Sequence, residues 1–167
     1  VALKALVTKK SLELFEKYQV LSCVELKSRY LIRLERYIKD LEIEVKCLNS
    51  ICVNQVIPAA TVYQKRLADA IVSSREALGK SADLAAQKEL LKNIIVLVNK
   101  IHAINADILA KVGAASSVHD EQKKAEMLCS KVKTRMNELR EYVDELEGLV
   151  DDELWPMPKF WEMLFIS

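Results

Sequence analysis

The fold is decided by residues 22–52, SCVELKSRYLIRLERYIKDLEIEVKCLNSIC. Ser22 and Glu25 form a capping-box pattern, in which each side chain can satisfy a free backbone N–H group at the start of a helix. Apolar residues then recur in steps of three and four, the spacing of one face of an α-helix. These residues are Leu26, Tyr30, Leu34, Tyr37, Leu41, Val45, Leu48 and Cys52. The stretch therefore predicts one long amphipathic helix.

The same apolar stripe resumes beyond Pro58 and predicts that the helix continues to Gly79. Proline removes a backbone donor and clashes with the carbonyl four residues earlier, here that of Asn54. Its neighbours, Val-Ile before it and Ala-Ala after it, contain no residues typical of turns, so a kink is favoured. The alternative is a reversal that would pack residues 30–52 antiparallel on residues 63–77. The resumed stripe comprises Ala59, Tyr63, Leu67 and Ile71.

Two further long helices are expected, each bounded by capping signals. Ser81 is a suitable N-cap for the first, which should end at Gly113, and Ser116 or Ser117 should cap the second. The first has the stripe Leu84, Leu91, Ile94, Val98, Ile101, Ile108 and Val112, and the second has Leu128, Val132, Met136, Leu139, Val143, Leu146 and Val150. A short helix is expected at about residues 10–18. Hairpin loops of about three residues require the long helices to run antiparallel.

The predicted fold class is all-α: an antiparallel coiled-coil-like bundle of three long helices, the first kinked at Pro58. A short N-terminal helix and an aromatic C-terminal tail complete it. One domain should span residues 1–167, with a connector and short helix at 1–21, the bundle at 22–150 and a docking tail at 151–167. Only 3 Gly and 3 Pro among 167 residues leave little material for turns, in agreement with long helices. Because the chain begins at Val1 and not at Met, residues are expected to precede it.

The aromatic residues gather in the last thirteen positions, which hold both tryptophans. Contiguous exposed aromatic surface usually marks a contact site, so Trp155, Phe160, Trp161 and Phe165 are the candidate docking residues. Two alternatives remain open from the residues alone. The tail either folds back to close its own bundle, or it docks on something outside the chain.

No catalytic, cofactor-binding or metal-binding residues are predicted. The two histidines, His102 and His119, lack the Glu-x-x-His spacing of a di-metal carboxylate bundle and are interpreted as structural or solvated. The four cysteines contain no Cys-x-x-Cys pair and are interpreted as free, buried thiols in a reducing cytoplasm. Three glycines cannot build a phosphate-binding loop.

Charge and hydropathy give no sign of a nucleic-acid or membrane partner. The net charge is +1, and four acids interrupt the basic stretch between residues 27 and 46. No uninterrupted apolar run approaches the length of a membrane span, and no signal sequence is visible. The acidic residues concentrated between positions 138 and 153 suggest basic neighbours or a solvated face.

Several segments, in order, resemble type III glutamine synthetases. The order ELWPMPKFWEMLF at residues 153–165 resembles the C-terminus of that family, and LFEKYQVLS at residues 14–22 resembles an earlier stretch. Shorter matches are VELKSRY at 24–30, LERY at 34–37, IEV at 43–45 and VIPAA at 56–60 with Tyr63. The region between about 70 and 145 is the least distinctive.

The resemblance implies the helical C-terminal extension of an enzyme that joins ammonia to glutamate at the expense of ATP. Such enzymes use a divalent metal and form cytoplasmic double-ring homo-oligomers. Their metal-, ATP- and glutamate-binding motifs lie in regions absent from this chain, so no catalytic residue is carried over, and the chain should be inactive alone. The expected partners are the catalytic region of the same polypeptide and neighbouring subunits. The alternative is a stand-alone helical protein-interaction module, which the coding sequence upstream of Val1 would distinguish.

Overall fold

The computed structural model describes residues 2–79 and 83–164, with the backbone alone for Ala2, Phe160 and Trp161. Within these ranges every regular element is a helix, so the all-α prediction is confirmed. The elements are η1 (Ala2–Val7), α1 (Lys9–Lys17), α2 (Cys23–Ile51), η2 (Cys52–Val56), α3 (Ile57–Leu78), α4 (Ala85–Ser116), α5 (Glu121–Met127), η4 (Leu128–Val132), α6 (Lys133–Glu147) and α7 (Phe160–Met163).

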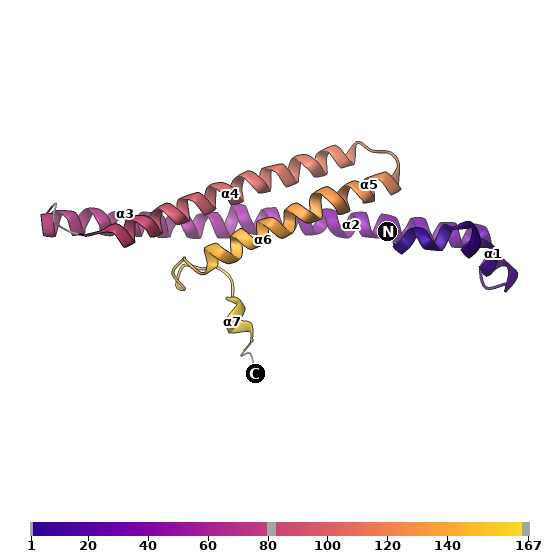
Figure 1. The fold of residues 1–167 in the computed structure, drawn as a ribbon, viewed down its shortest axis with the longest axis horizontal. Helices are drawn as coiled ribbons and strands as arrows, with labels where there is room; N and C mark the ends of the chain where they lie inside the picture. The colour runs from indigo at the N-terminus through magenta and orange to yellow at the C-terminus, as the bar shows by residue number, and fades with distance from the viewer. Residues whose placement is uncertain (1, 80–82, 165–167) are drawn as a thin grey trace.

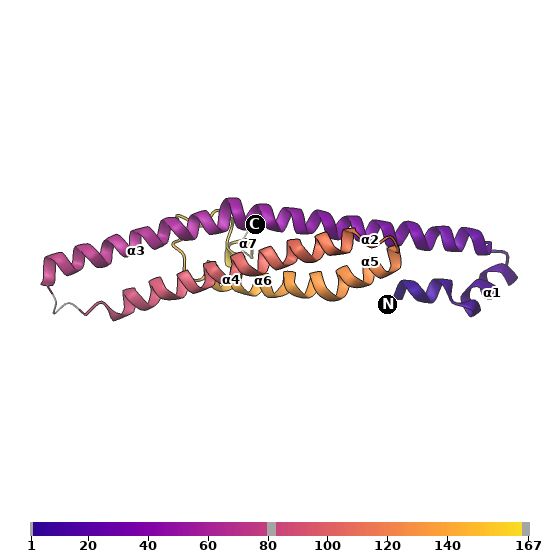
Figure 2. The ribbon, with the colours of Figure 1, turned by 90° about the horizontal axis from the view of Figure 1, so that it is seen from above.

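The molecule is a long, narrow rod (Figures 1 and 2). α2 and α3 follow one another along its whole length, and α4 runs back beside them. α5 and α6 then return along α4 as far as the middle of the rod, where α7 leaves it. η1 and α1 fold back on the start of α2. Beyond the end of α6, the rod consists of α3 and the first part of α4 alone.

The predicted cap of the long helix is present. The Ser22 hydroxyl accepts a hydrogen bond from the Glu25 N–H at 3.2 Å, and the Glu25 carboxylate accepts one from the Ser22 N–H at 2.8 Å. The bond from the Ser22 N–H is the main reason why the pKa of Glu25 lies below its ordinary value. The helix ends as expected at Gly79, whose φ of 73° lies in the left-handed region that glycine adopts at low cost.

The chain does not reverse at Pro58. The backbone dihedrals of Ile51, Cys52, Val56 and Ile57 are all right-handed helical, so the alternative of a reversal is wrong. Residues 52–56 form a π-helical turn, in which the Ile57 N–H donates to the Cys52 carbonyl. A π turn is wider than an α turn. In a regular α-helix the ring of Pro58 would clash with the backbone carbonyl of Asn54, and the wider turn directly precedes the proline. The kink at Pro58 stays a prediction.

The boundary between the second and third long helices differs from the prediction. α4 continues through Gly113 to Ser116, and neither Ser116 nor Ser117 caps the next helix. Asp120 does so, because its Oδ1 accepts from the N–H groups of Gln122 at 2.9 Å and Lys123 at 3.1 Å. A glycine inside a helix costs only about 1 kcal/mol, which the burial of apolar neighbours offsets.

The start of α4 also differs. The predicted cap, Ser81, lies outside the described residues, and the helix begins at Ala85. Leu84, expected on the helical stripe, precedes the helix but is buried. The short first helix spans Lys9–Lys17, one residue earlier than expected, and the 3-10 helix η1 before it was not predicted.

One core runs along the rod where the helices face each other. Most of the predicted stripe residues belong to it, although Ile38 and Leu97 are more deeply buried than the predicted Tyr37 and Val98. The largest fully buried side chains are Ile38, Val45, Cys52, Val56, Ile94, Ile101, Ile108, Leu128, Val132, Leu139 and Leu146. A polar pair interrupts this core: the Asn105 side-chain amide donates to the Asn49 side-chain oxygen at 2.8 Å, joining α4 to α2.

Ion pairs join the helices around the core. Lys124 binds Glu42 at 3.0 Å, which links α5 to α2, and Arg135 binds Asp107 at 3.1 Å, which links α6 to α4. The Lys124–Glu42 pair is the better shielded, because both side chains are less than 20% exposed. Burial alone would raise the pKa of Glu42, but hydrogen bonds from Lys124 and Lys39 outweigh burial and leave the pKa below its ordinary value.

We expect Glu42 to make the stability of the bundle depend on pH. A carboxyl group whose pKa is lower in the folded than in the unfolded chain stabilises the fold above the unfolded pKa, about 4.3. That contribution is lost as the pH falls through the folded pKa. Glu42→Gln should therefore lower the free energy of unfolding by about 1–2 kcal/mol at pH 7 and have little effect at pH 3. Urea unfolding of both proteins at the two pH values checks this, and an equal loss at both would contradict it.

α4 carries apolar residues outside its buried face, because Ile95, Val96 and Leu109 are exposed. By length and average hydropathy it could cross a membrane, although 28% of its most apolar window is buried inside the structure. An uninterrupted apolar run is nevertheless absent from this helix, because the charged residues Lys100, Asp107 and Lys111 interrupt it. One such helix is weak evidence for a membrane segment, because core helices of other proteins pass the same test.

Candidate interaction site at the C-terminal end

The chain leaves the bundle through a tightly bonded turn after α6. Val150 is buried, and its N–H donates to the Leu146 carbonyl at 3.0 Å. Asp151 then organises the next residues: its carboxylate accepts from the Glu153 N–H, and its carbonyl accepts from the N–H groups of Leu154 and Trp155. The same carboxylate binds Arg66 of α3 at 3.3 Å. The start of the tail is thus fixed to the long helix.

Trp155 lies in the core of the bundle. Its side chain is 7% exposed and belongs to the same buried cluster as Leu139 and Leu146. Its indole N–H has no hydrogen-bond partner among the described residues. A buried donor without an acceptor costs about 1–3 kcal/mol, so the indole ring is held here by its apolar contacts alone.

Lys159 fastens the tail a second time. The residue is 8% exposed, its ammonium group donates to the Val150 carbonyl at 3.3 Å, and it forms an ion pair with Asp152. Buried lysines are rare unless they are paired, and here one pair closes a loop of eight residues. The Lys159 N–H also donates to the Glu162 carboxylate at 2.9 Å, which sets the start of α7.

α7 points away from the rod (Figure 1). The residues that end it are open to solvent: the side chains of Met163 and Leu164 are 52% and 66% exposed. The tail therefore has two parts of opposite character. Residues 150–159 are anchored to the bundle, and Glu162, Met163 and Leu164, beyond that anchor, are exposed.

The four predicted docking residues divide between these parts. Trp155 belongs to the anchored part, and Phe160 and Trp161 lie in α7, where only their backbone is described. Phe165 lies outside the described residues, so the docking role of all four stays a prediction. Sequence reasoning missed Arg66, Asp151, Asp152 and Lys159, which fix the anchor. The sequence pointed to these contacts only through the acidic residues between positions 138 and 153, which suggested that basic side chains lie nearby.

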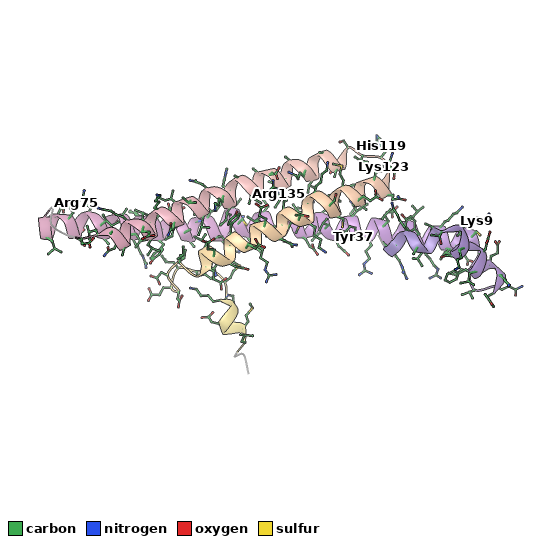
Figure 3. The ribbon with its side chains drawn as sticks, in the orientation of Figure 1. Lys9, Tyr37, Arg75, His119, Lys123 and Arg135 are labelled. Carbon is green, nitrogen blue, oxygen red and sulfur yellow. The ribbon has the colours of Figure 1, made fainter. Side chains whose placement is uncertain are left out.

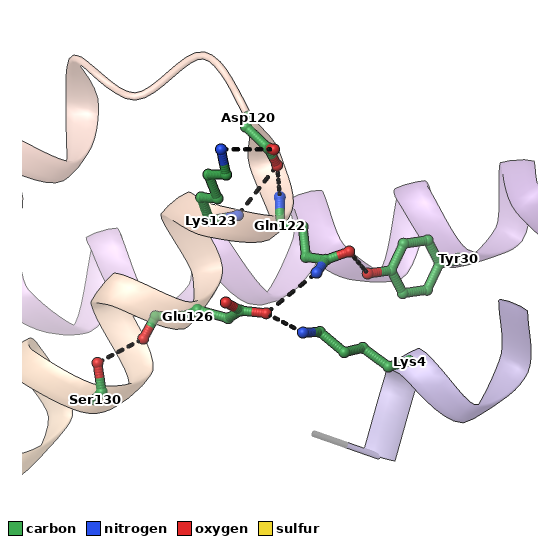
Figure 4. A network of polar contacts seen from close by, with 7 residues as sticks. All are labelled: Lys4, Tyr30, Asp120, Gln122, Lys123, Glu126 and Ser130. Atoms are coloured by element: carbon green, nitrogen blue, oxygen red, sulfur yellow. Dashed lines mark hydrogen bonds and ion pairs between the residues drawn. The ribbon is translucent and has the colours of Figure 1, made fainter. Parts of the chain in front are cut away.

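A second polar cluster joins η1, α2 and α5, at the opposite end of the α5–α6 helix from the tail (Figure 4). The Tyr30 hydroxyl donates to the Gln122 side-chain oxygen at 3.2 Å, and the Gln122 amide donates to Glu126 at 3.2 Å. Lys4 of η1 binds Glu126 at 2.5 Å. The hydrogen bond from Lys4 is the main cause that lowers the pKa of Glu126. These contacts tie η1 to α5, and α5 to α2.

The remaining candidate groups are dispersed. Among the described residues, no group of three or more His, Cys, Asp or Glu side chains could hold a metal ion. Both histidines are exposed, and His119 lies in the turn between α4 and α5 (Figure 3). All four cysteines are free, but only Cys52 is buried, so the expectation of four buried thiols is wrong. Burial raises the pKa of Cys52 to about 11, which keeps it a neutral thiol.

The sequence is similar to known proteins along most of its length. A family described as "Glutamine synthetase C-terminal domain" matches residues 1–75. The chain is 32% identical to a type-3 glutamine synthetase of Dictyostelium discoideum over 99% of its own length. The resemblance to the C-terminal region of type III glutamine synthetases is therefore confirmed.

Two bacterial relatives agree with this result. The chain is 31% identical to a glutamine synthetase of Bacteroides fragilis over 84% of its length. It is 26% identical to a glutamine synthetase of Butyrivibrio fibrisolvens over 95% of its length. In all three cases the match covers 20–23% of the relative, so the chain spans less than a quarter of the length of these synthetases.

Proposed function

We propose that this chain is the structural and assembly domain at the C-terminus of a type III glutamine synthetase. The parent enzyme would join ammonia to glutamate with ATP and a divalent metal, as a cytoplasmic homo-oligomer of nitrogen metabolism. The antiparallel bundle would be the scaffold, and the aromatic tail would dock on the catalytic region of the same polypeptide or on a neighbouring subunit. The chain itself would contribute no catalytic residue.

One observation supports this assignment above the others: the tail is anchored at its base and exposed beyond it. Trp155 and Lys159 are both more than nine-tenths buried, whereas Met163 and Leu164, a few residues later, are more than half exposed. An anchored base limits the conformational freedom of the segment that follows, which lowers the entropy lost when that segment binds a partner.

Substitutions at the exposed end of the tail test the proposal. In the full-length synthetase, Met163→Asp with Leu164→Asp should weaken subunit assembly, because a docked apolar segment would have to bury two charges. Light scattering coupled to size-exclusion chromatography measures the oligomer. In the isolated chain, the same change should leave the midpoint of thermal unfolding unchanged within about 2 °C.

Val24→Asp is the matched control, because Val24 is 77% exposed but lies at the far end of α2. It should alter neither the oligomer nor the stability of the isolated chain. Full assembly and full glutamine synthetase activity in the double variant would refute a docking role for the tail. Assembly lost equally in the Val24→Asp control would show only that added charge disturbs the protein.

A further inference from the structure

A cavity of about 460 Å³ lies between η1, α2 and the continuous helix formed by α5, η4 and α6. Its volume falls within the range of small-molecule sites, which is roughly 300–1,000 Å³. The apolar part of the wall consists of Leu3, Leu34, Ala125 and the ring of Tyr30. Part of the lining comes from the π-helical turn η4, an irregularity that often accompanies functional sites.

One end of the cavity is occupied by polar groups that satisfy each other. Tyr30, Gln122, Glu126 and Lys4 form the chain of hydrogen bonds and the ion pair described above (Figure 4). The ammonium group of Lys4 is neutralised by Glu126. No net charge is therefore left at this end to attract an ionic ligand.

The other end of the cavity presents the side chains of Tyr37, Cys129 and Lys133. Tyr37 lies seven residues after Tyr30 on α2, and Cys129 lies seven residues after Gln122 on the facing helix. Burial, with the neighbouring Cys129 thiol, raises the pKa of Tyr37 to about 12, so its hydroxyl remains a neutral donor. Lys133 completes this end and forms no ion pair within the described part of the chain.

We propose that this cavity binds a medium-chain alkyl monocarboxylate. The alkyl chain would lie against Leu3, Leu34 and Ala125, and the carboxylate would face Lys133 and the Tyr37 hydroxyl. Among the residues that line the cavity, Lys133 is the cation whose charge no lining carboxylate balances, so it matches one negative charge, although Glu44 also acts on Tyr37 from the same helix. The binding site is independent of the assembly role proposed above, because it lies at the opposite end of α6 from the tail.

Titration of the 167-residue chain with decanoate tests the proposal. Isothermal calorimetry should give a dissociation constant of about 0.1 mM, the range expected for a ligand of this size. 1-Decanol, which keeps the alkyl chain and lacks the charge, should bind at least fivefold more weakly. Lys133→Gln should weaken decanoate binding roughly fivefold. Lys131→Gln is the matched control, because Lys131 is exposed on the adjacent π turn but does not line the cavity.

A second variant tests whether decanoate occupies the cavity, without removing a charge. Ser130 lines the cavity and is exposed, so Ser130→Trp should fill the space without disturbing the core. Decanoate binding should then become undetectable at 1 mM while the helical circular dichroism stays unchanged. Equal affinity for decanoate and decanol, equal affinity in Lys133→Gln and wild type, or no binding at 1 mM to wild type would each overturn the proposal.

Discussion

Replacing Trp155 with alanine should lower the free energy of unfolding of the isolated chain by about 3–5 kcal/mol, the cost of removing a large aromatic side chain from a packed core. The indole ring is 7% exposed and contacts the buried cluster that α4 and α6 share. Its loss would leave a cavity at the end of the bundle and would also release the turn that Asp151 organises. Urea unfolding followed by circular dichroism measures the change.

Two further variants make this result specific. Trp155→Phe should cost much less than Trp155→Ala, because it retains most of the apolar contacts and removes an indole N–H that has no acceptor in the described chain. Leu164→Ala should change stability by less than about 0.5 kcal/mol, because Leu164 is 66% exposed. If Trp155→Ala left the unfolding free energy unchanged, the tail would not be anchored to its own bundle.

The helical core could be predicted from the sequence because its signal is repeated many times. Steps of three and four placed Leu34, Leu41 and Val45 on the buried face of α2, and all three are buried. The prediction rests on many positions, so one residue assigned to the wrong face does not change it. Tyr37, which is only half-buried, is an example. The family could be recognised for the same reason, because several short matches occur in one order along the chain.

Helix ends and irregular turns depend on competition that a local pattern does not reveal. Gly113 is a strong stop signal, yet α4 passes through it because Val112 and Ala115 on either side pack into the bundle. The π turns at residues 52–56 and 128–132 have no residue signature of their own, since each arises from how the whole helix fits its neighbours.

The contacts that fix the tail were also beyond sequence reasoning. Arg66 and Asp151 are separated by 85 residues, and either could have remained solvated. Glu42 shows the same difficulty, because it binds Lys124 of another helix as well as Lys39 of its own. Charge pairs between helices require the register of the bundle, and hydropathy gives only the faces that meet.

Two adjacent residues of α4 should respond very differently to truncation. Ile108 is fully buried, whereas Leu109 is 43% exposed. Ile108→Ala should lower the free energy of unfolding by about 2–5 kcal/mol, because it removes buried methyl groups and leaves a cavity that the neighbouring helices cannot close. Leu109→Ala should cost less than about 1 kcal/mol, since the lost side chain is largely in contact with water already.

Comparing Ile108→Ala with Leu109→Ala shows which face of α4 forms the core. The average hydropathy of the helix cannot show this. The helix exposes some apolar residues, Ile95, Val96 and Leu109, and a scale that ignores direction treats the buried Ile108 and the exposed Leu109 as equivalent. The apolar stripe of period 3.6 distinguishes the two residues, because it contains Ile108 and omits Leu109. Equal losses of stability in the two variants, measured by urea unfolding, would mean that α4 is rotated relative to the arrangement described. A large loss confined to Ile108→Ala would leave the exposed apolar face of α4 free for contacts that the isolated chain does not need for folding.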